Sequence, residues 1–158
     1  MGIEIERKFL LVGNAWRSAV SNSVEITQGY IAQTDTCSVR VRIAGERGSI
    51  NFKGVTIGIR RSEFEAEIPL SDAVQMLQEF CEPRIIRKIR HVVEHEGHRW
   101  EIDEFGGANQ GLIVAELELK TEHDIFARPD WLGEDVTDDP RYYNVQLVEN
   151  PFGSWSRG

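Results

Sequence analysis

Near the start of the chain, two carboxylates and an ammonium group recur at every second position. Glu4, Glu6 and Lys8 share one parity, whereas Ile5 and Phe9 share the other. Alternate side chains of a β-strand project from opposite faces, so the three charges would leave one face together. On a solvent-facing sheet this is an ordinary amphipathic strand. On an inward face, the same groups would share one space, where carboxylates can bind a metal ion and an ammonium can bind an anion.

The alternation of charged and apolar residues continues and predicts a chain rich in strands. A helix of about ten residues is predicted from Ser71, because Ala73, Val74 and Leu77 recur at helical spacing, and another spans 142–148. Eight short strands with hairpin-length connections predict an antiparallel α+β fold or a closed barrel. The predicted strands are 3–11, 24–32, 37–44, 49–55, 60–68, 85–95, 98–105 and 112–120.

The function of the charged residues depends on whether their face of each strand is exposed to solvent or lines the inside of a barrel. The apolar faces are too regular to be left in water and the helices are amphipathic, so we expect the helices outside and the charged faces lining the lumen. Burying several cations together would require an anion. The competing interpretation is a sheet with a salt-bridged outer surface. The cations that would line the lumen are Lys8, Arg40, Arg42, Lys53, Lys88 and Arg90.

A triphosphate is a polyanion that fits this set of cations. Arginine holds phosphate oxygens with two parallel hydrogen bonds, and lysine acts as a point charge. Carboxylates that face the same space are hard oxygen ligands suited to Mg²⁺ or Mn²⁺, which would bridge protein and phosphate. These carboxylates are Glu4, Glu6, Glu63, Glu65, Glu101, Asp103, Glu116 and Glu118.

Length and composition narrow the class of protein. The chain has 158 residues, which predicts a single domain over 1–158. Its 18 basic and 26 acidic residues give a net charge of −8, which argues against an exposed nucleic-acid-binding surface. Cys37 and Cys81 lack metal-type spacing and no leader is recognisable, so we expect a reduced, cytoplasmic protein. A run of about 18 apolar residues, which a membrane-spanning helix needs, does not occur.

A series of short motifs resembles the triphosphate tunnel metalloenzymes, the CYTH superfamily. Glu4 to Leu10, E-I-E-R-K-F-L, is similar to their opening E-x-E-x-K signature. The resemblance implies a closed eight-stranded antiparallel tunnel with helices outside, divalent-metal dependence and a triphosphate substrate, closest in pattern to bacterial inorganic triphosphatases. The later motifs are Q-G-Y at 28–30, R-V-R at 40–42, Lys53, E-F-E at 63–65, R-K-I-R at 87–90, E-I-D-E-F at 101–105, E-L-E at 116–118 and G-E-D-V-T-D-D-P-R-Y-Y-N at 133–144.

The resemblance also implies roles for single residues. Glu63, Glu65 and Asp103 match a second acidic cluster that could bind an ion, position water or orient the basic residues. We group them with Tyr30 as catalytic candidates. Family members with thiamine triphosphatase activity have lysine in place of Tyr30, and a phenol with a pKa of about 10 is a poorer base at neutral pH. The implied triphosphate ligands are Lys8, Arg40, Arg42, Lys53, Lys88 and Arg90, and the implied metal ligands are Glu4, Glu6, Glu116 and Glu118.

Our leading hypothesis from the sequence is metal-dependent hydrolysis of a triphosphate, most simply inorganic tripolyphosphate. The alternatives are a class IV adenylate cyclase, a thiamine triphosphatase and a non-catalytic polyphosphate-binding module. A cyclase would need a nucleoside pocket at the tunnel mouth, and the sequence identifies none. The expected partner is a small molecule with a triphosphate group rather than nucleic acid or a membrane, and a homodimer is left open.

Overall fold

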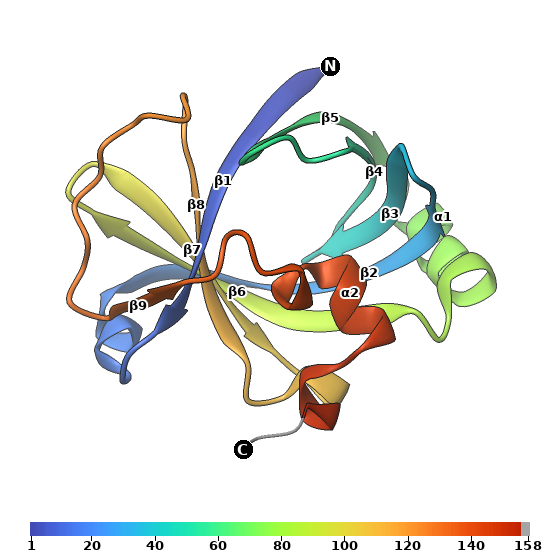
Figure 1. Cartoon of the computed structure of the whole chain (residues 1–158). Helices are drawn as coiled ribbons and strands as arrows, with labels where there is room; N and C mark the ends of the chain where they lie inside the picture. Colours follow the sequence, from blue (N-terminus) through green and yellow to red (C-terminus); the bar gives the residue numbers. More distant parts are fainter. Residues whose placement is uncertain (156–158) are drawn as a thin grey trace.

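The computed structural model describes residues 1–155, most of which form one closed antiparallel sheet. Eight strands follow one another in the order β5-β4-β3-β2-β6-β7-β8-β1, and pairing of β5 with β1 closes the barrel (Figure 1). The eight-stranded barrel predicted from the sequence is therefore confirmed. The strands are β1 (Gly2–Leu11), β2 (Val20–Gln33), β3 (Cys37–Ala44), β4 (Arg47–Gly54), β5 (Arg60–Ile68), β6 (Ile85–His95), β7 (His98–Phe105) and β8 (Ile113–Glu118). A short ninth strand, β9 (Leu132–Asp135), pairs with the end of β1.

The helices differ in detail from the predicted ones. Helix α1 (Leu70–Met76) starts directly after Pro69, so Ser71 lies within its first turn and is not the N-cap. Helix α1 continues directly into a π-helical segment, η2 (Leu77–Cys81). The C-terminal helix α2 (Asn144–Glu149) is shorter than predicted because the 3₁₀ turn η4 (Pro140–Tyr142) precedes it. Further 3₁₀ turns are η1 (Ala15–Ala19), η3 (Gly107–Asn109) and η5 (Phe152–Ser154). No helix in residues 1–155 is long and apolar enough to cross a membrane.

The outer face of the barrel is buried in two separate places. Trp100 and Phe9, both fully buried, lie at the centre of the larger cluster, where Trp16 of η1 and Trp131 cover the outside of β1, β6, β7 and β8. Helix α1 and η2 cover β2 and β3 through a smaller cluster around Val41. These two clusters explain why the outward-facing positions of the strands are regularly apolar.

A glycine allows η2 to approach the sheet closely. A Cβ atom at Gly29 would lie 2.5 Å from the Cβ atom of Cys81, which is a severe clash. The helical segment can therefore pack on β2 only where the strand carries no side chain. Gly29 is the central residue of the Q-G-Y motif, and its neighbours Gln28 and Tyr30 project from the opposite face, into the barrel.

The inner face of the barrel has an apolar end, and α2 packs against it. Inward-facing Ile86, Phe105 and Val114 form one cluster with Tyr142 and Leu147 of the C-terminal segment. Figure 1 shows α2 lying across the barrel opening. Helices α1 and η1 therefore pack outside the barrel, as predicted, whereas α2 packs against one end of its inner face. The physical reason is that the strands present apolar side chains to the lumen near this end, and burying them favours an inserted helix.

Burial on the outer face generates a stability prediction. Trp100→Ala should lower the free energy of unfolding by about 3–5 kcal/mol, because the side chain is fully buried between Phe9, Phe126 and Trp131. Phe64→Ala is the control, because Phe64 is 46% exposed on β5, and it should cost about 1 kcal/mol or less. Urea unfolding followed by tryptophan-independent far-ultraviolet circular dichroism measures both. Equal losses would contradict the assignment of the core.

Candidate functional site

The charged part of the inner face surrounds a cavity of about 260 Å³. Of the fourteen residues predicted for the site, every one except Asp103 lines this cavity. Alternation along the strands brings them inside, and closure of β5 onto β1 brings the two ends of the sheet together. Arg7, which has the opposite parity to Glu6 and Lys8, lies outside and contacts Asp135 and the Phe9 ring.

The cavity contains as many carboxylates as cations among the described residues. Arg61 joins the six predicted cations, so seven cations face seven carboxylates. The sequence argument counted six basic residues and concluded that an anion must neutralise them. Because the protein supplies its own carboxylates, the need for a ligand depends on which charges are paired. The carboxylates are Glu4, Glu6, Glu63, Glu65, Glu101, Glu116 and Glu118.

Four carboxylates in the cavity, Glu4, Glu63, Glu101 and Glu116, already have cationic partners, and Glu4 and Glu116 have two each. Glu4 accepts hydrogen bonds from Lys53 Nζ at 2.9 Å and from Arg61 Nε at 3.1 Å. Glu116 lies 3.6 Å from Lys8 Nζ and 3.4 Å from Arg90 Nη2. Burial acts to raise the pKa of both carboxyl groups, but the neighbouring cations outweigh it and hold each pKa well below its ordinary value. Both groups are therefore ionised.

Two arginines on β3 lack such partners. Arg40 is 7% exposed, and among residues 1–155 no hydrogen-bond acceptor reaches its Nε. Arg42 donates from Nε and Nη2 to the neutral Oε1 of Gln28, at 3.0 and 2.9 Å, and forms no ion pair within the described chain. Burial, with the charges of Arg40 and Arg90, lowers the pKa of Arg42 to about 9. Two adjacent guanidinium groups that form no ion pair with a carboxylate of residues 1–155 are chemically suited to an anion.

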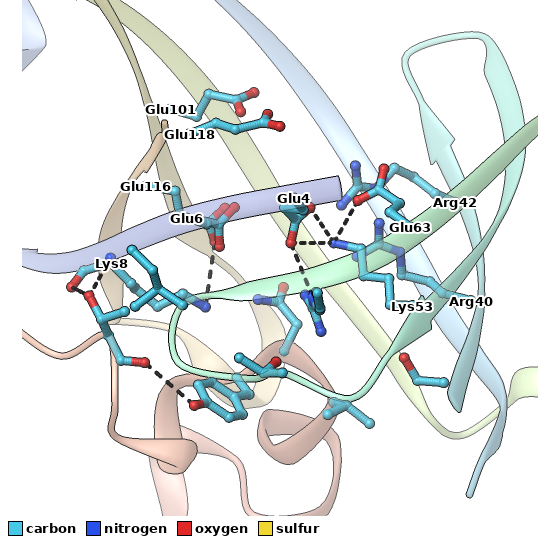
Figure 2. A pocket seen from close by; sticks show the side chains of 18 of the residues that line it. Glu4, Glu6, Lys8, Arg40, Arg42, Lys53, Glu63, Glu101, Glu116 and Glu118 are labelled. Carbon is cyan, nitrogen blue, oxygen red and sulfur yellow. Dashed lines mark hydrogen bonds and ion pairs between the residues drawn. The ribbon is translucent and has the colours of Figure 1, made fainter. Parts of the chain in front are cut away.

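Glu6 and Glu118 show the opposite imbalance. They are cross-strand neighbours on β1 and β8, and neither forms an ion pair within residues 1–155. Burial in the lumen and the charges of Glu116 and Glu4 raise the pKa of Glu6 to about 8. Burial, Glu4 and Glu101 likewise raise the pKa of Glu118. Figure 2 shows Glu101, Glu116 and Glu118 on one side of Glu6, and Arg40 and Arg42 on the other.

A divalent cation would relieve the repulsion among these carboxylates, and their oxygens are the ligands that Mg²⁺ and Mn²⁺ prefer. Glu6, Glu116 and Glu118 therefore fit a metal ion chemically, and Glu4 fits once Lys53 and Arg61 move away. Within the part of the chain that the structure describes, no three acidic, histidine or cysteine side chains are already arranged around a common metal position. Metal binding would thus have to draw these side chains together.

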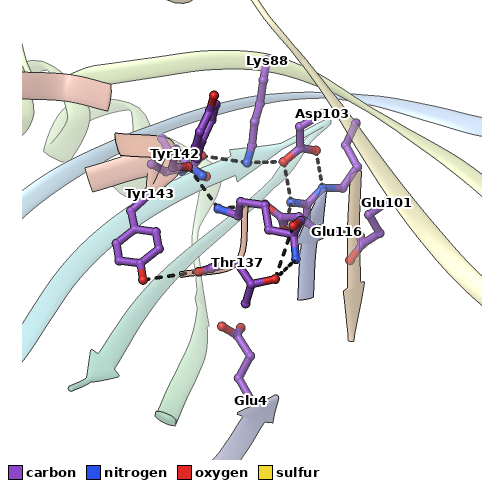
Figure 3. A network of polar contacts seen from close by, with 12 residues as sticks. Glu4, Lys88, Glu101, Asp103, Glu116, Thr137, Tyr142 and Tyr143 are labelled. Carbon is purple, nitrogen blue, oxygen red and sulfur yellow. Dashed lines mark hydrogen bonds and ion pairs between the residues drawn. The ribbon is translucent and has the colours of Figure 1, made fainter. Parts of the chain in front are cut away.

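Asp103 does not join Glu63 and Glu65. It lies fully buried behind the cavity wall, where its carboxylate accepts hydrogen bonds from Lys88 Nζ at 2.6 Å and Arg90 Nε at 2.8 Å (Figure 3). Glu63 instead lies 3.5 Å from Lys53, and Glu65 accepts a hydrogen bond from Asn51. Of the roles considered for the acidic cluster, the geometry of Asp103 matches the orientation of basic residues. Burial lowers the pKa of Lys88 to about 7 even beside Asp103.

Several residues of the cavity were not predicted. Arg61 shares its parity with Glu63 and Glu65, so the alternation on β5 could have revealed it. Tyr143 and Asn144 could not be found in this way, because they reach the cavity from the inserted C-terminal segment. The Tyr30 hydroxyl lies in the cavity wall and accepts a long hydrogen bond, 3.5 Å, from Gln28 Nε2.

Known proteins are similar to this chain in sequence and in fold. Residues 2–144 match the family described as the CYTH domain. The chain is 46% identical over 152 residues to a protein of Acetivibrio thermocellus named inorganic triphosphatase, covering 96% of this chain and 97% of the relative. A Nitrosomonas europaea protein of the same name is 33% identical over 149 residues, or 92% and 96% of the two chains. A crystal structure described as an inorganic triphosphatase superposes with a TM-score of 0.66 at 31% identity, covering 94% of this chain and 95% of that chain.

The raised pKa of Glu6 generates a prediction about stability in metal-free buffer. An unfolded Glu6 loses its proton near pH 4.5, whereas the folded protein keeps it to about pH 8. Between these values the folded state binds the extra proton, so the Glu6 contribution to the free energy of unfolding falls as pH rises, by at most ~1.4 kcal/mol per pH unit. The wild type should therefore lose stability relative to Glu6→Gln between pH 5 and 8.

Urea unfolding in EDTA at several pH values measures this difference. Lys88, whose lowered pKa acts in the opposite direction above about pH 7, is present in both proteins and cancels. Glu46→Gln, in the exposed turn between β3 and β4, is the control and should leave the pH dependence of the wild type unchanged. A pH-independent difference between the wild type and Glu6→Gln would contradict the assignment.

Proposed function

The chain belongs to the CYTH family, and from this premise we propose that it hydrolyses inorganic tripolyphosphate to pyrophosphate and orthophosphate with the help of a divalent metal ion. The observation that carries the proposal is that two adjacent guanidinium groups in the cavity, those of Arg40 and Arg42, form no ion pair with a carboxylate of residues 1–155. The names of the relatives at 46% and 33% identity support inorganic triphosphate as the substrate.

The cations of the cavity would bind the substrate and stabilise charge in the transition state. Phosphoryl transfer requires positioned charge around the equatorial oxygens more than covalent chemistry by the protein. Arg40 and Arg42 offer free N–H groups for phosphate oxygens, and Asp103 holds Lys88 and Arg90 in place behind the cavity wall. Lys8 and Lys53 complete the set from β1 and β4. The cations thus approach the substrate from four strands, β1, β3, β4 and β6, which fixes the orientation of the phosphate chain.

Hydrolysis adds water to a terminal phosphorus atom and breaks its bond to the bridging oxygen, so the attacking water must give up a proton. Among the predicted catalytic residues, Glu63 is the group we assign to accept it. A hydrogen bond with Glu4 and burial raise the pKa of Glu63, which makes it more basic than an ordinary carboxylate. Glu65, held by Asn51 at 2.8 Å, would orient the water, and Tyr30 would contact the substrate from the wall.

The metal ion would be held by Glu4, Glu6, Glu116 and Glu118, the carboxylates predicted for this role. Mg²⁺ or Mn²⁺ bound there would polarise the phosphoryl group as a Lewis acid. Glu6 would have to lose its proton and Glu4 would have to give up its contacts with Lys53 and Arg61. We therefore propose that metal and substrate bind together, because the phosphate chain offers these two cations a new anionic partner.

Phosphate release from a panel of substrates tests the function. With Mg²⁺ or Mn²⁺, tripolyphosphate should release phosphate, and EDTA should abolish the release. ATP, thiamine triphosphate and pyrophosphate complete the panel. Formation of cyclic AMP from ATP without phosphate release would identify a cyclase. A preference for thiamine triphosphate would identify a thiamine triphosphatase. Binding of tripolyphosphate without turnover, in every divalent ion tried, would identify a binding module.

We also propose a cytoplasmic location and a homodimer. The free thiols of Cys37 and Cys81 support the cytoplasmic location. The homodimer stays a prediction because the structure contains one chain. Light scattering of the purified protein measures the molar mass in solution.

Arg40 yields a prediction about substrate binding. Arg40→Gln should raise the KM for tripolyphosphate about 10–100-fold, because a charge-assisted hydrogen bond is worth about 1.5–3 kcal/mol. Arg60→Gln, at an exposed position of β5 that does not line the cavity, is the matched control and should keep the wild-type KM. Steady-state phosphate release measures both. An unchanged KM in Arg40→Gln would remove Arg40 from the anion site.

A further inference from the structure

Two neutral amide side chains connect the cations of the cavity to helix α2. Gln28, which is fully buried on β2, accepts both hydrogen bonds from Arg42 and donates from Nε2 to Asn144 Oδ1 at 3.1 Å. Asn144 is the first residue of α2, and its Oδ1 also accepts a hydrogen bond from Lys88 Nζ at 2.9 Å. One oxygen atom of α2 therefore links the positions of Arg42 and Lys88.

Gln28 and Asn144 carry no charge, which distinguishes them from the carboxylate that also holds cations here. Asp103 shows what a carboxylate does here, because it holds Lys88 and Arg90 and also neutralises them. An amide oxygen accepts the same hydrogen bonds but brings no charge. Gln28 therefore holds Arg42 in position and leaves its positive charge available to an anion, and Asn144 orients Lys88 without adding a second negative charge to that of Asp103. A glutamine with no exposed surface would otherwise be costly on an inward-facing strand, since burying an amide is tolerated only when its polar groups are paired.

Helix α2 is thereby part of the wall of the binding site. Its apolar side packs onto the inner end of the barrel through Leu147, and its first residue reaches the cations. Figure 3 shows Lys88 lying between Asp103 and the segment of Tyr142 and Tyr143 that leads into α2. A shift of α2 would move the Asn144 oxygen and release both Lys88 and Gln28. The position of the helix and the geometry of Arg42 and Lys88 are coupled through the Asn144 oxygen.

We propose that Gln28 and Asn144 are positioning residues of the triphosphate site, which orient Arg42 and Lys88 toward the phosphate chain without neutralising them. This inference rests on the proposed function, because the ligand that the oriented cations bind is the triphosphate. Neither amide needs to touch the reacting atoms. Each acts through a cation, and the two act through one hydrogen-bonded chain that starts on α2 and ends at Arg42.

Steady-state kinetics with tripolyphosphate and Mg²⁺ or Mn²⁺ separate this role from a merely structural one. Gln28→Ala and Asn144→Ala should each raise KM about tenfold and lower kcat less, because the cations lose orientation for binding. The double variant should be no worse than the poorer single variant within about twofold, since both residues belong to one chain. Glu149→Gln is the control on the same helix, where Glu149 is exposed and pairs with Arg84, and it should behave as wild type.

A charged replacement gives the sharpest test. Asn144→Asp keeps the shape and the hydrogen bond to Lys88 but adds the negative charge that the amide avoids. Its melting temperature without ligand should equal or exceed that of the wild type, while its KM for tripolyphosphate rises more than that of Asn144→Ala. Stability and substrate affinity would then change in opposite directions, which loss of structure alone does not produce. This variant also serves if Asn144→Ala fails to fold.

The outcomes distinguish the inference from the proposed function. A wild type that releases no phosphate from tripolyphosphate would overturn both. A wild type that turns over tripolyphosphate while Asn144→Ala and Asn144→Asp keep its KM would overturn the positioning role alone. Multiplicative losses in the double variant would overturn the single hydrogen-bonded chain, because they would mean that Gln28 and Asn144 act independently.

Discussion

Compensation of charge inside a closed barrel is the constraint on which the rest of this structure depends. Closure of β5 onto β1 places one face of every strand in the lumen, and that face carries seven cations and seven carboxylates around one cavity. Charges withdrawn from water are tolerated only when opposite charges or hydrogen bonds replace the lost solvation. The pairs Lys53 with Glu4 and Lys88 with Asp103 meet that requirement within the protein.

The compensation is incomplete at two places, and these places define the site. Within residues 1–155, neither Arg40 nor Arg42 forms an ion pair with a carboxylate, and neither Glu6 nor Glu118 forms one with a cation. The first pair favours an anion and the second favours a cation, although the cavity as a whole is balanced in formal charge. A metal ion together with a phosphate chain would satisfy both needs at once, so the cavity could bind a highly charged substrate although its own formal charges balance.

The apolar end of the inner face has a different role. Ile86, Phe105 and Val114 continue the inward parity of Lys88, Asp103 and Glu116, so each of three strands changes from charged to apolar along its length. The apolar end attracts α2 by burial, and the charged end receives Asn144 from the same helix. Packing of the helix and organisation of the cations are therefore parts of one arrangement, in which the hydrophobic effect places a polar group at the cavity.

Alternation of charged and apolar residues in the sequence was enough to predict the eight strands and the inward parity of Glu4, Glu6 and Lys8. Of the fourteen residues predicted for the site, thirteen line the cavity. The prediction was possible because alternation along a strand is a local property that survives closure into a barrel. Which charges pair, that Asp103 lies behind the wall, and that Asn144 enters the cavity were decided by the tertiary structure alone. These contacts join residues far apart in the chain, such as Gln28 and Asn144, and the period of a strand carries no information about a helix inserted from the C-terminus.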